Sequence, residues 1–170
     1  MVAPDNDEQL VMAADGLIKS SDHPHVSVVV IGRNEGSRLV ECLQSIATVS
    51  RCCALEVIYV DSNSTDGSPQ RAAALGAQVL QVNPERPSAA TGRNAGWRAA
   101  RGEFVLFLDG DTKLHPDFVA RALPVFEDAT VAVVCGHRRE INPKQSFYVR
   151  VLDLDWVWRP GDVESCGGDA

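Results

Sequence analysis

The feature that most restricts the fold of this chain is a regular alternation of short apolar runs with segments of helical periodicity. The run Val26–Ile31 is rich in β-branched residues, which is typical of a strand buried on both faces. Apolar residues then recur at helical spacing from Leu39 to Ala47. Further strands are predicted at Leu55–Val60, Ala77–Val82, Glu103–Leu108 and Thr130–Cys135. Further helices are predicted from Pro69, with Ser68 as N-cap and Gly76 just past the helix end, and over Ala89–Ala100, Pro116–Glu127 and Ser146–Trp158, where the aromatic residues leave a strand as the alternative. This alternation predicts an α/β domain with a mostly parallel central sheet.

The start of the chain differs from the rest. Residues 1–24 are polar and acidic, which predicts a partly disordered leader before a domain that spans residues 25–170. The leader lacks the apolar core of a signal peptide, and no apolar run is long enough to cross a bilayer. The five cysteines include no Cys-x-x-Cys pair, which disfavours a zinc site and favours reduced thiols in a cytoplasmic protein.

The charge of the chain narrows the class of partner. The formal net charge is −7 and the isoelectric point is near 5.0. Nucleic acids and anionic membrane surfaces select for an excess of Lys and Arg, so neither is predicted as the main partner. A small phosphorylated ligand is compatible with this charge, because a few local groups can hold it.

Carboxylates gather where the predicted strands end. Asn34 and Glu35 follow the first strand, Asp61 and Asp66 follow the second, and the Asp109-Gly110-Asp111 segment follows Phe104–Leu108. Parallel strands place their carboxyl ends at one edge of a sheet, where ligands of open α/β sheets bind. Crowded carboxylates repel one another, and a divalent cation such as Mg²⁺ or Mn²⁺ relieves that repulsion. A metal-assisted site is therefore predicted at this edge.

Each of these motifs has a purely structural explanation when it is taken alone. Asp-Gly-Asp is common in ordinary turns, and a polar residue that ends a buried strand can satisfy the backbone of a loop. Arg93 lies in a predicted helix, where an arginine is usually a solvated surface group. The position of Asp109 directly after an apolar strand favours the functional explanation.

Four motifs in fixed order resemble the family 2 glycosyltransferases. They are Val-Ser-Val-Val-Val-Ile-Gly-Arg-Asn-Glu at 26–35, Val-Asp-Ser-Asn-Ser-Thr-Asp-Gly-Ser at 60–68, Gly-Arg-Asn-Ala-Gly at 92–96 and Phe-Leu-Asp-Gly-Asp-Thr at 107–112. The resemblance covers roughly residues 26–170. It implies a Rossmann-like GT-A fold with a mostly parallel sheet. It also implies inverting transfer of a sugar from a nucleoside-diphosphate sugar donor to an acceptor hydroxyl.

The resemblance also implies a role for each motif. The segment around Asn34 and Glu35 corresponds to the first nucleotide-contacting loop, and Asp61 to the carboxylate that reads the base. Asp66 falls in the polar loop behind it, and Arg93 corresponds to an arginine near the nucleotide. In the Asp-x-Asp motif, Asp109 is expected near the ribose and the metal, and Asp111 is the main metal ligand. The metal is Mg²⁺ or Mn²⁺, acting as a Lewis acid on the departing diphosphate.

The catalytic base is not assigned. In the family it is an Asp or Glu that usually lies beyond a double glycine, and here Gly167-Gly168 is followed directly by Asp169, a weak candidate, and Ala170. The sequence therefore predicts a donor-binding half that stops before the acceptor region. A non-catalytic nucleotide-binding fragment remains an alternative. A sugar-phosphate nucleotidyltransferase is disfavoured, because the loop at Arg33–Gly36 is not rich in glycine and basic residues.

Overall fold

The computed structural model describes residue 18, residues 21–49, 53–85 and 88–155, and residue 161. It divides the chain into two compact units, Met1–Ala120 and Arg121–Ala170. The first unit contains β1 (Val26–Gly32), α2 (Ser37–Val49), β2 (Leu55–Asp61), α3 (Ser68–Ala74), β3 (Gln78–Gln81), α4 (Ala89–Ala99) and β4 (Phe104–Asp109), followed by α5 (Phe118–Ala122), which crosses its boundary. The predicted alternation of strands and helices is thus confirmed up to β4.

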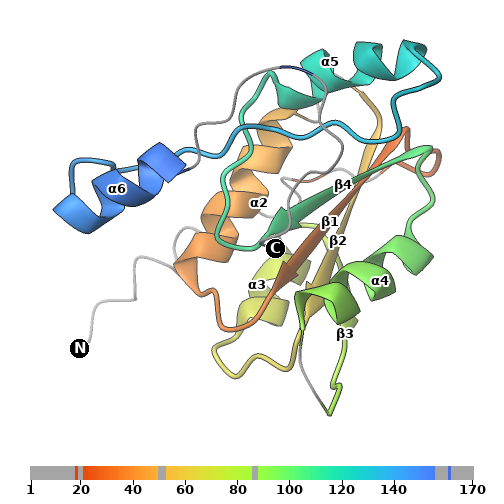
Figure 1. Cartoon of the computed structure of the whole chain (residues 1–170). Helices are drawn as coiled ribbons and strands as arrows, with labels where there is room; N and C mark the ends of the chain where they lie inside the picture. The colour runs from red at the N-terminus through yellow and green to blue at the C-terminus, as the bar shows by residue number, and fades with distance from the viewer. Residues whose placement is uncertain (1–17, 19–20, 50–52, 86–87, 156–160, 162–170) are drawn as a thin grey trace. The chain divides into compact units, whose positions relative to one another are not determined.

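All pairs of neighbouring strands in the sheet are parallel, and the strand order is β3-β2-β1-β4. Helix α4 covers one face of the sheet, while α2 and α3 lie on the other (Figure 1). The two central strands, β1 and β2, are almost wholly buried, as their continuous apolar sequences predict. Ile18, before β1, contacts the sheet unit, since its backbone amide donates to the carbonyl of Leu75 at 3.0 Å.

Two glycines allow α4 to approach the sheet closely. A Cβ atom added at Gly92 would meet the Ile31 side chain at 3.1 Å, and one at Gly96 would collide with the side chain of Val29. The glycines that weaken the sequence-based helix prediction therefore serve packing. They let the helix backbone rest directly on the β-branched residues of β1.

We expect Gly96→Ala to lower the free energy of unfolding by up to about 2 kcal/mol, because the added methyl group overpacks this contact at a cost of about 1–3 kcal/mol. The gain in helix propensity, about 1 kcal/mol, offsets only part of that cost. Asn94→Ala on the exposed side of α4 is the matched control, and it should be neutral or slightly stabilising. Urea denaturation of both variants measures the difference, and equal stabilities would contradict the close approach.

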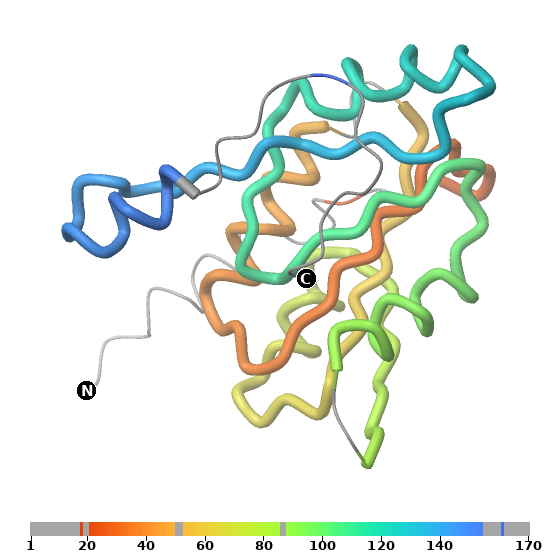
Figure 2. The backbone as a smooth tube through the Cα atoms, in the orientation of Figure 1, coloured from red at the N-terminus to blue at the C-terminus, as the bar shows by residue number. Residues whose placement is uncertain are grey.

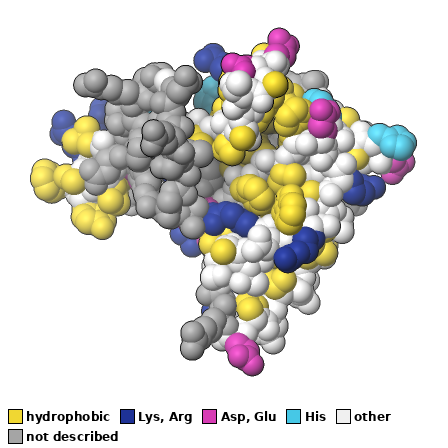
Figure 3. Space-filling view, turned by 45° about the vertical axis from the view of Figure 1, so that its right-hand side comes forward, with side chains coloured by type: hydrophobic (Ala, Val, Ile, Leu, Met, Phe, Trp, Pro, Cys, Tyr) yellow, Lys and Arg dark blue, Asp and Glu magenta, His cyan; other side chains and the backbone are white. Residues whose placement is uncertain are grey.

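Strand β4 lies at an edge of the sheet and is less buried than its neighbours. Among the described residues of the first unit, the large hydrophobic side chains that are exposed are Phe107 on β4 and Trp97 on α4. Hydrophobic side chains gather near the middle of the face in Figure 3, beside Lys and Arg side chains. The edge position explains why β4 keeps apolar surface accessible.

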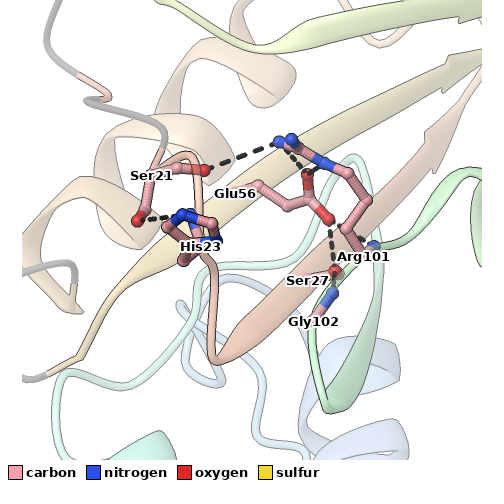
Figure 4. A network of polar contacts seen from close by, with 6 residues as sticks. All are labelled: Ser21, His23, Ser27, Glu56, Arg101 and Gly102. Atoms are coloured by element: carbon pink, nitrogen blue, oxygen red, sulfur yellow. Dashed lines mark hydrogen bonds and ion pairs between the residues drawn. The ribbon is translucent and has the colours of Figure 1, made fainter.

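A polar network joins the amino-terminal ends of the strands, opposite the predicted site (Figure 4). Glu56 is 2% exposed and accepts hydrogen bonds from Ser27 Oγ at 2.6 Å, from the Arg101 amide at 2.7 Å and from Arg101 Nε at 2.9 Å. The amide of Gly102 in turn donates to Ser27 Oγ at 2.8 Å. One buried carboxylate thus connects β1, β2 and the loop that leads into β4.

The second unit departs from the sequence-based prediction. Residues 130–135 form no strand, because a strand requires a hydrogen-bonded partner, and Val133 is 65% exposed. The predicted helix Pro116–Glu127 begins only at Phe118 and continues as a 3₁₀ helix over Leu123–Glu127.

The last helix among the described residues, α6 (Phe147–Asp155), confirms the helix predicted from Ser146, and the predicted end at Trp158 lies outside the described residues. Asp153 on α6 forms a two-pronged ion pair with Arg139, at 2.9 and 2.8 Å, and accepts from the Glu140 amide. These hydrogen bonds lower the pKa of Asp153 to about 2. Cys135 is disulfide-bonded, so the prediction of reduced thiols is wrong there, because sequence spacing does not reveal which cysteines meet. Among the described helices, none combines the length and the apolar character that crossing a membrane requires.

Candidate functional site

The backbone leaves the parallel strands at a common end of the sheet, which Figure 2 traces. In the register of the ladder, Gly32 of β1 lies beside Asp61 of β2, and Ile31 lies beside Asp109 of β4. The two aspartates therefore flank the end of the central strand, as the parallel arrangement predicts. The loops that follow these strands carry Asn34, Glu35, Asp66 and Asp111, whereas Arg93 lies on α4.

Asn34 fastens the loop after β1 to the loop after β2. The backbone amide of Asn34 donates to Ser64 Oγ at 2.9 Å, and its side-chain oxygen accepts from the backbone amide of Thr65 at 2.8 Å. Asn34 adopts a φ of 58°, a left-handed conformation that asparagine tolerates better than most residues. Asn34, which the sequence predicts to contact the ligand, therefore stabilises the two loops in this conformation.

Asp66 makes a second fastening between the same loops. Its carboxylate accepts from the Gly36 amide at 2.9 Å and from the Ser68 amide at 3.0 Å. Burial would raise the pKa of Asp66, but the hydrogen bonds from Ser68 and Gly36 outweigh it and the pKa is lowered. The predicted N-cap at Ser68 is wrong, because Gly67 occupies that position and Asp66 supplies the acceptor for the first turn of α3.

Asp61 lies beneath these loops and is fully buried. One of its carboxylate oxygens accepts from the Tyr59 hydroxyl at 3.0 Å, and the other accepts from the Ser64 amide at 2.9 Å. Burial, followed by the negative charge of Asp61, raises the pKa of Tyr59, which keeps the phenol protonated as a donor. Tyr59 was missed at the sequence level, although its spacing of two residues from Asp61 places both on one face of β2.

Arg93 of α4 contacts the carboxylate at the end of β4. Its Nη2 donates to Asp109 Oδ1 at 2.7 Å, and the Arg93 side chain is only 19% exposed. The close approach of α4 to the sheet brings the guanidinium into reach. The structural interpretation of Arg93 as a solvated surface group is therefore wrong.

A second arginine, Arg38 in the first turn of α2, lies between two carboxylates. Its Nη2 is 2.9 Å from Glu35 Oε2, and its Nη1 is 3.9 Å from Asp111 Oδ2. The Oε2 atom of Glu35 is buried and has no hydrogen-bond partner of good geometry within the described residues. Its compensating polar contact is therefore the ion pair with Arg38. Arg38 was also missed from the sequence, where its spacing of three residues from Glu35 was the available signal.

The thiol of Cys42 reports the negative potential of the site. This buried free cysteine lies behind the strand end, with its sulfur 3.8 Å from the Asp109 carbonyl oxygen. Burial, followed by the charges of Asp111, Asp109 and Glu35, raises its pKa to about 12. The three carboxylates therefore act on one point, which is the condition that favours a bound cation.

The donor set fits a hard divalent cation only in part. Within the described residues, no group of three or more His, Cys, Asp or Glu side chains is placed to hold a metal ion. Mg²⁺ is nevertheless usually bound through one or two carboxylates together with substrate phosphates. Asp111, whose side chain is 50% exposed, and Asp109 meet that requirement. The weak candidate base Asp169 lies outside the described residues.

Comparison with known proteins was made against families, curated sequences and solved structures. The model of the family described as "Glycosyl transferase family 2" matches residues 27–165. An N-acetylglucosaminyltransferase of Mesorhizobium japonicum is 31% identical over 143 residues, which cover 78% of this chain and 33% of that protein. A glucosyl-3-phosphoglycerate synthase of Mycolicibacterium paratuberculosis is 37% identical over 101 residues, covering 55% of this chain and 31% of that protein.

Among solved structures, the glucosyl-3-phosphoglycerate synthase of Mycobacterium tuberculosis in complex with Mn²⁺, uridine diphosphate and phosphoglyceric acid is similar to this chain. The TM-score is 0.53 at 27% identity, and the match covers 74% of this chain and 44% of that one. The chain spans about a third of the length of the curated relatives it matches first. The fold is the α/β GT-A fold with a parallel central sheet.

Proposed function

Because the chain belongs to glycosyl transferase family 2, we propose that its strand-end site binds a nucleoside-diphosphate sugar for transfer to an acceptor hydroxyl. The observation that carries this proposal is the convergence of Asp61 and Asp109 on either side of the end of β1, with Asp111 next to them. Similar structures contain uridine diphosphate, which makes it the first nucleotide to test.

The nucleotide is proposed to lie over the interlocked loops after β1 and β2. Asn34 and Asp66 hold these loops together, and Asp61 supports them from below through Ser64. In this arrangement Asp61 shapes the surface for the base and ribose, and direct contact would need the loop above it to shift. Arg93 holds Asp109 in place and adds positive charge near the ribose side of the site.

Asp111 and Asp109 are proposed to hold Mg²⁺ or Mn²⁺. When bound, the cation would stabilise the negative charge that develops on the departing diphosphate. The residues of this chain would orient the diphosphate and hold the carboxylates of Asp111 and Asp109 in position. The proposed reaction inverts the anomeric carbon, and its general base remains unassigned.

The test of this proposal uses the full chain and a panel of nucleoside-diphosphate sugars, with uridine diphosphate as the reference ligand. Calorimetry with Mn²⁺ and with chelator measures binding, and release of the nucleoside diphosphate measures turnover. Metal-dependent binding together with turnover supports the transferase. Metal-dependent binding without turnover would favour the alternative, a nucleotide-binding module, and no binding of any nucleotide would refute the proposal.

Asp61→Ala is expected to weaken uridine diphosphate binding about tenfold, both with Mn²⁺ and with chelator. The substitution leaves the buried Tyr59 hydroxyl and Ser64 amide without an acceptor, which costs about 1–3 kcal/mol and loosens the loop. Tyr59→Phe removes one donor and keeps the carboxylate, so its effect should be smaller. An effect of Asp61→Ala that disappears with chelator would instead place Asp61 in the metal site.

A further inference from the structure

Arg38 lies beside one of the two carboxylates proposed to hold a divalent cation. The guanidinium contacts Glu35 at 2.9 Å and approaches Asp111 to 3.9 Å, so one positive charge is shared by two of the three carboxylates Glu35, Asp109 and Asp111. Asp109, the third, is paired with Arg93. In this state two arginines offset most of the negative charge of the three carboxylates, and a cation that binds Asp111 meets positive charge already in place.

The two arginines differ in how firmly they are held. The Arg93 side chain is 19% exposed and donates a hydrogen bond of 2.7 Å, whereas the Arg38 side chain is 61% exposed and reaches Asp111 only at the limit of an ion pair. Long exposed side chains exchange rotamers readily. Arg38 can leave Asp111 without disturbing the sheet, while Arg93 is confined between α4 and β4.

We infer that Arg38 is a built-in counter-ion that competes with the divalent cation for Asp111, so that it weakens metal binding in the absence of the donor. This inference rests on the proposed metal site. It assigns Arg38 a positioning role that acts through the Asp111 carboxylate. The repulsion between a guanidinium and a divalent cation about 4 Å apart in water is about twice that between unit charges, which corresponds to a change of up to about thirtyfold in affinity.

The experiment titrates the full chain with Mn²⁺ alone and follows free Mn²⁺ by electron paramagnetic resonance. Arg38→Gln is expected to bind Mn²⁺ up to about thirtyfold more tightly than the unaltered chain. Arg38→Lys, which keeps the charge, should stay near the affinity of the unaltered chain. Arg98→Gln makes the same change of net charge at an exposed position of α4 and should have little effect. Circular dichroism verifies that each variant is folded.

Thermal unfolding provides a second readout that does not depend on activity. Without metal, Arg38→Gln should unfold at a lower temperature than the unaltered chain, because Glu35 and Asp111 lose the guanidinium that pairs with both. Saturating Mn²⁺ should raise that temperature more in the variant than in the unaltered chain. A purely structural role for Arg38 would lower both temperatures and weaken metal binding.

The outcomes separate the inference from the proposed function. Unchanged or weaker Mn²⁺ binding in Arg38→Gln overturns the inference, as does an equal gain in Arg98→Gln. If Asp111→Asn still abolishes Mn²⁺ binding in those cases, the proposed metal site stands. If the unaltered chain shows no Mn²⁺ binding that depends on Asp111, both the metal site and the competition at it are refuted.

Discussion

Asp111→Asn is expected to abolish the increase in uridine diphosphate affinity that Mn²⁺ provides. Asp111 is the most accessible carboxylate of the strand-end group, with a side chain 50% exposed, and it lies just beyond the end of β4. An amide keeps the shape of the side chain but removes the negative charge that binds a hard cation. We expect the metal-dependent part of the affinity to fall by ~100-fold or more, beyond the 10–100-fold cost of removing a partner of a metal ligand.

Calorimetric titration with uridine diphosphate, in Mn²⁺ and in chelator, measures this difference. Affinity in chelator should stay close to that of the unaltered chain, because Asp111 has no part in fastening the nucleotide loops. Asp22→Asn, the same chemical change at an exposed position before β1, is the matched control and should bind normally under both conditions. A Mn²⁺ effect that survives in Asp111→Asn would show that the cation is held elsewhere.

Glu56→Ala is expected to lower the free energy of unfolding by about 2–4 kcal/mol. Glu56 is 2% exposed, and removal of its carboxylate leaves the Ser27 hydroxyl and the Arg101 backbone amide without an acceptor. Breaking a buried ion pair costs about 3–5 kcal/mol, but the Arg101 side chain is 55% exposed and regains part of its solvation. The network in Figure 4 should therefore be a main contributor to the stability of the first unit.

The same carboxylate should make stability depend on pH. Burial would raise the pKa of Glu56, but hydrogen bonds from Ser27 and Arg101 together with the Arg101 charge lower it below the ordinary value of 4.5. A lowered folded-state pKa means that the stabilisation is complete above the ordinary value and is lost as the pH falls through the folded one. Glu56→Gln should remove this dependence.

Urea denaturation of the full chain at neutral and acidic pH measures both effects. Glu103→Ala is the matched control, because this carboxylate also forms an ion pair, with His25 at 3.3 Å, but its side chain is 69% exposed. Its substitution should change stability by no more than about 0.5 kcal/mol, as for other exposed pairs. Equal losses of unfolding free energy in Glu56→Ala and Glu103→Ala would show that the buried network stabilises the first unit no more than an exposed ion pair does.

The agreement between sequence and structure is best where the governing interactions are local or general. Strands β1, β2 and β4 and helices α2 and α4 form close to their predicted positions, because periodicity and β-branched composition express burial directly. The meeting of Asp61 and Asp109 at one edge was also predictable, since parallel strands with right-handed crossovers impose it on any sequence of this pattern.

The wrong predictions depend on partners that a local pattern does not reveal. The apolar run at residues 130–135 has the composition of a strand, but a strand also requires a neighbour to satisfy its backbone. Ser68 has the chemistry of an N-cap, yet the left-handed turn at Gly67 moves the cap one residue earlier and leaves Asp66 to accept from the first turn.

The sequence alone determined the fold class, the order of the elements in the first unit and the edge of the sheet at which polar residues meet. Only the tertiary structure decided which side chains share that edge as partners. Tyr59 supports Asp61, Arg93 pairs with Asp109, and Arg38 lies between Glu35 and Asp111. The reason is physical: strand and helix formation follows from periodicity along the chain, whereas contacts between groups as many as 73 positions apart follow from packing and side-chain direction.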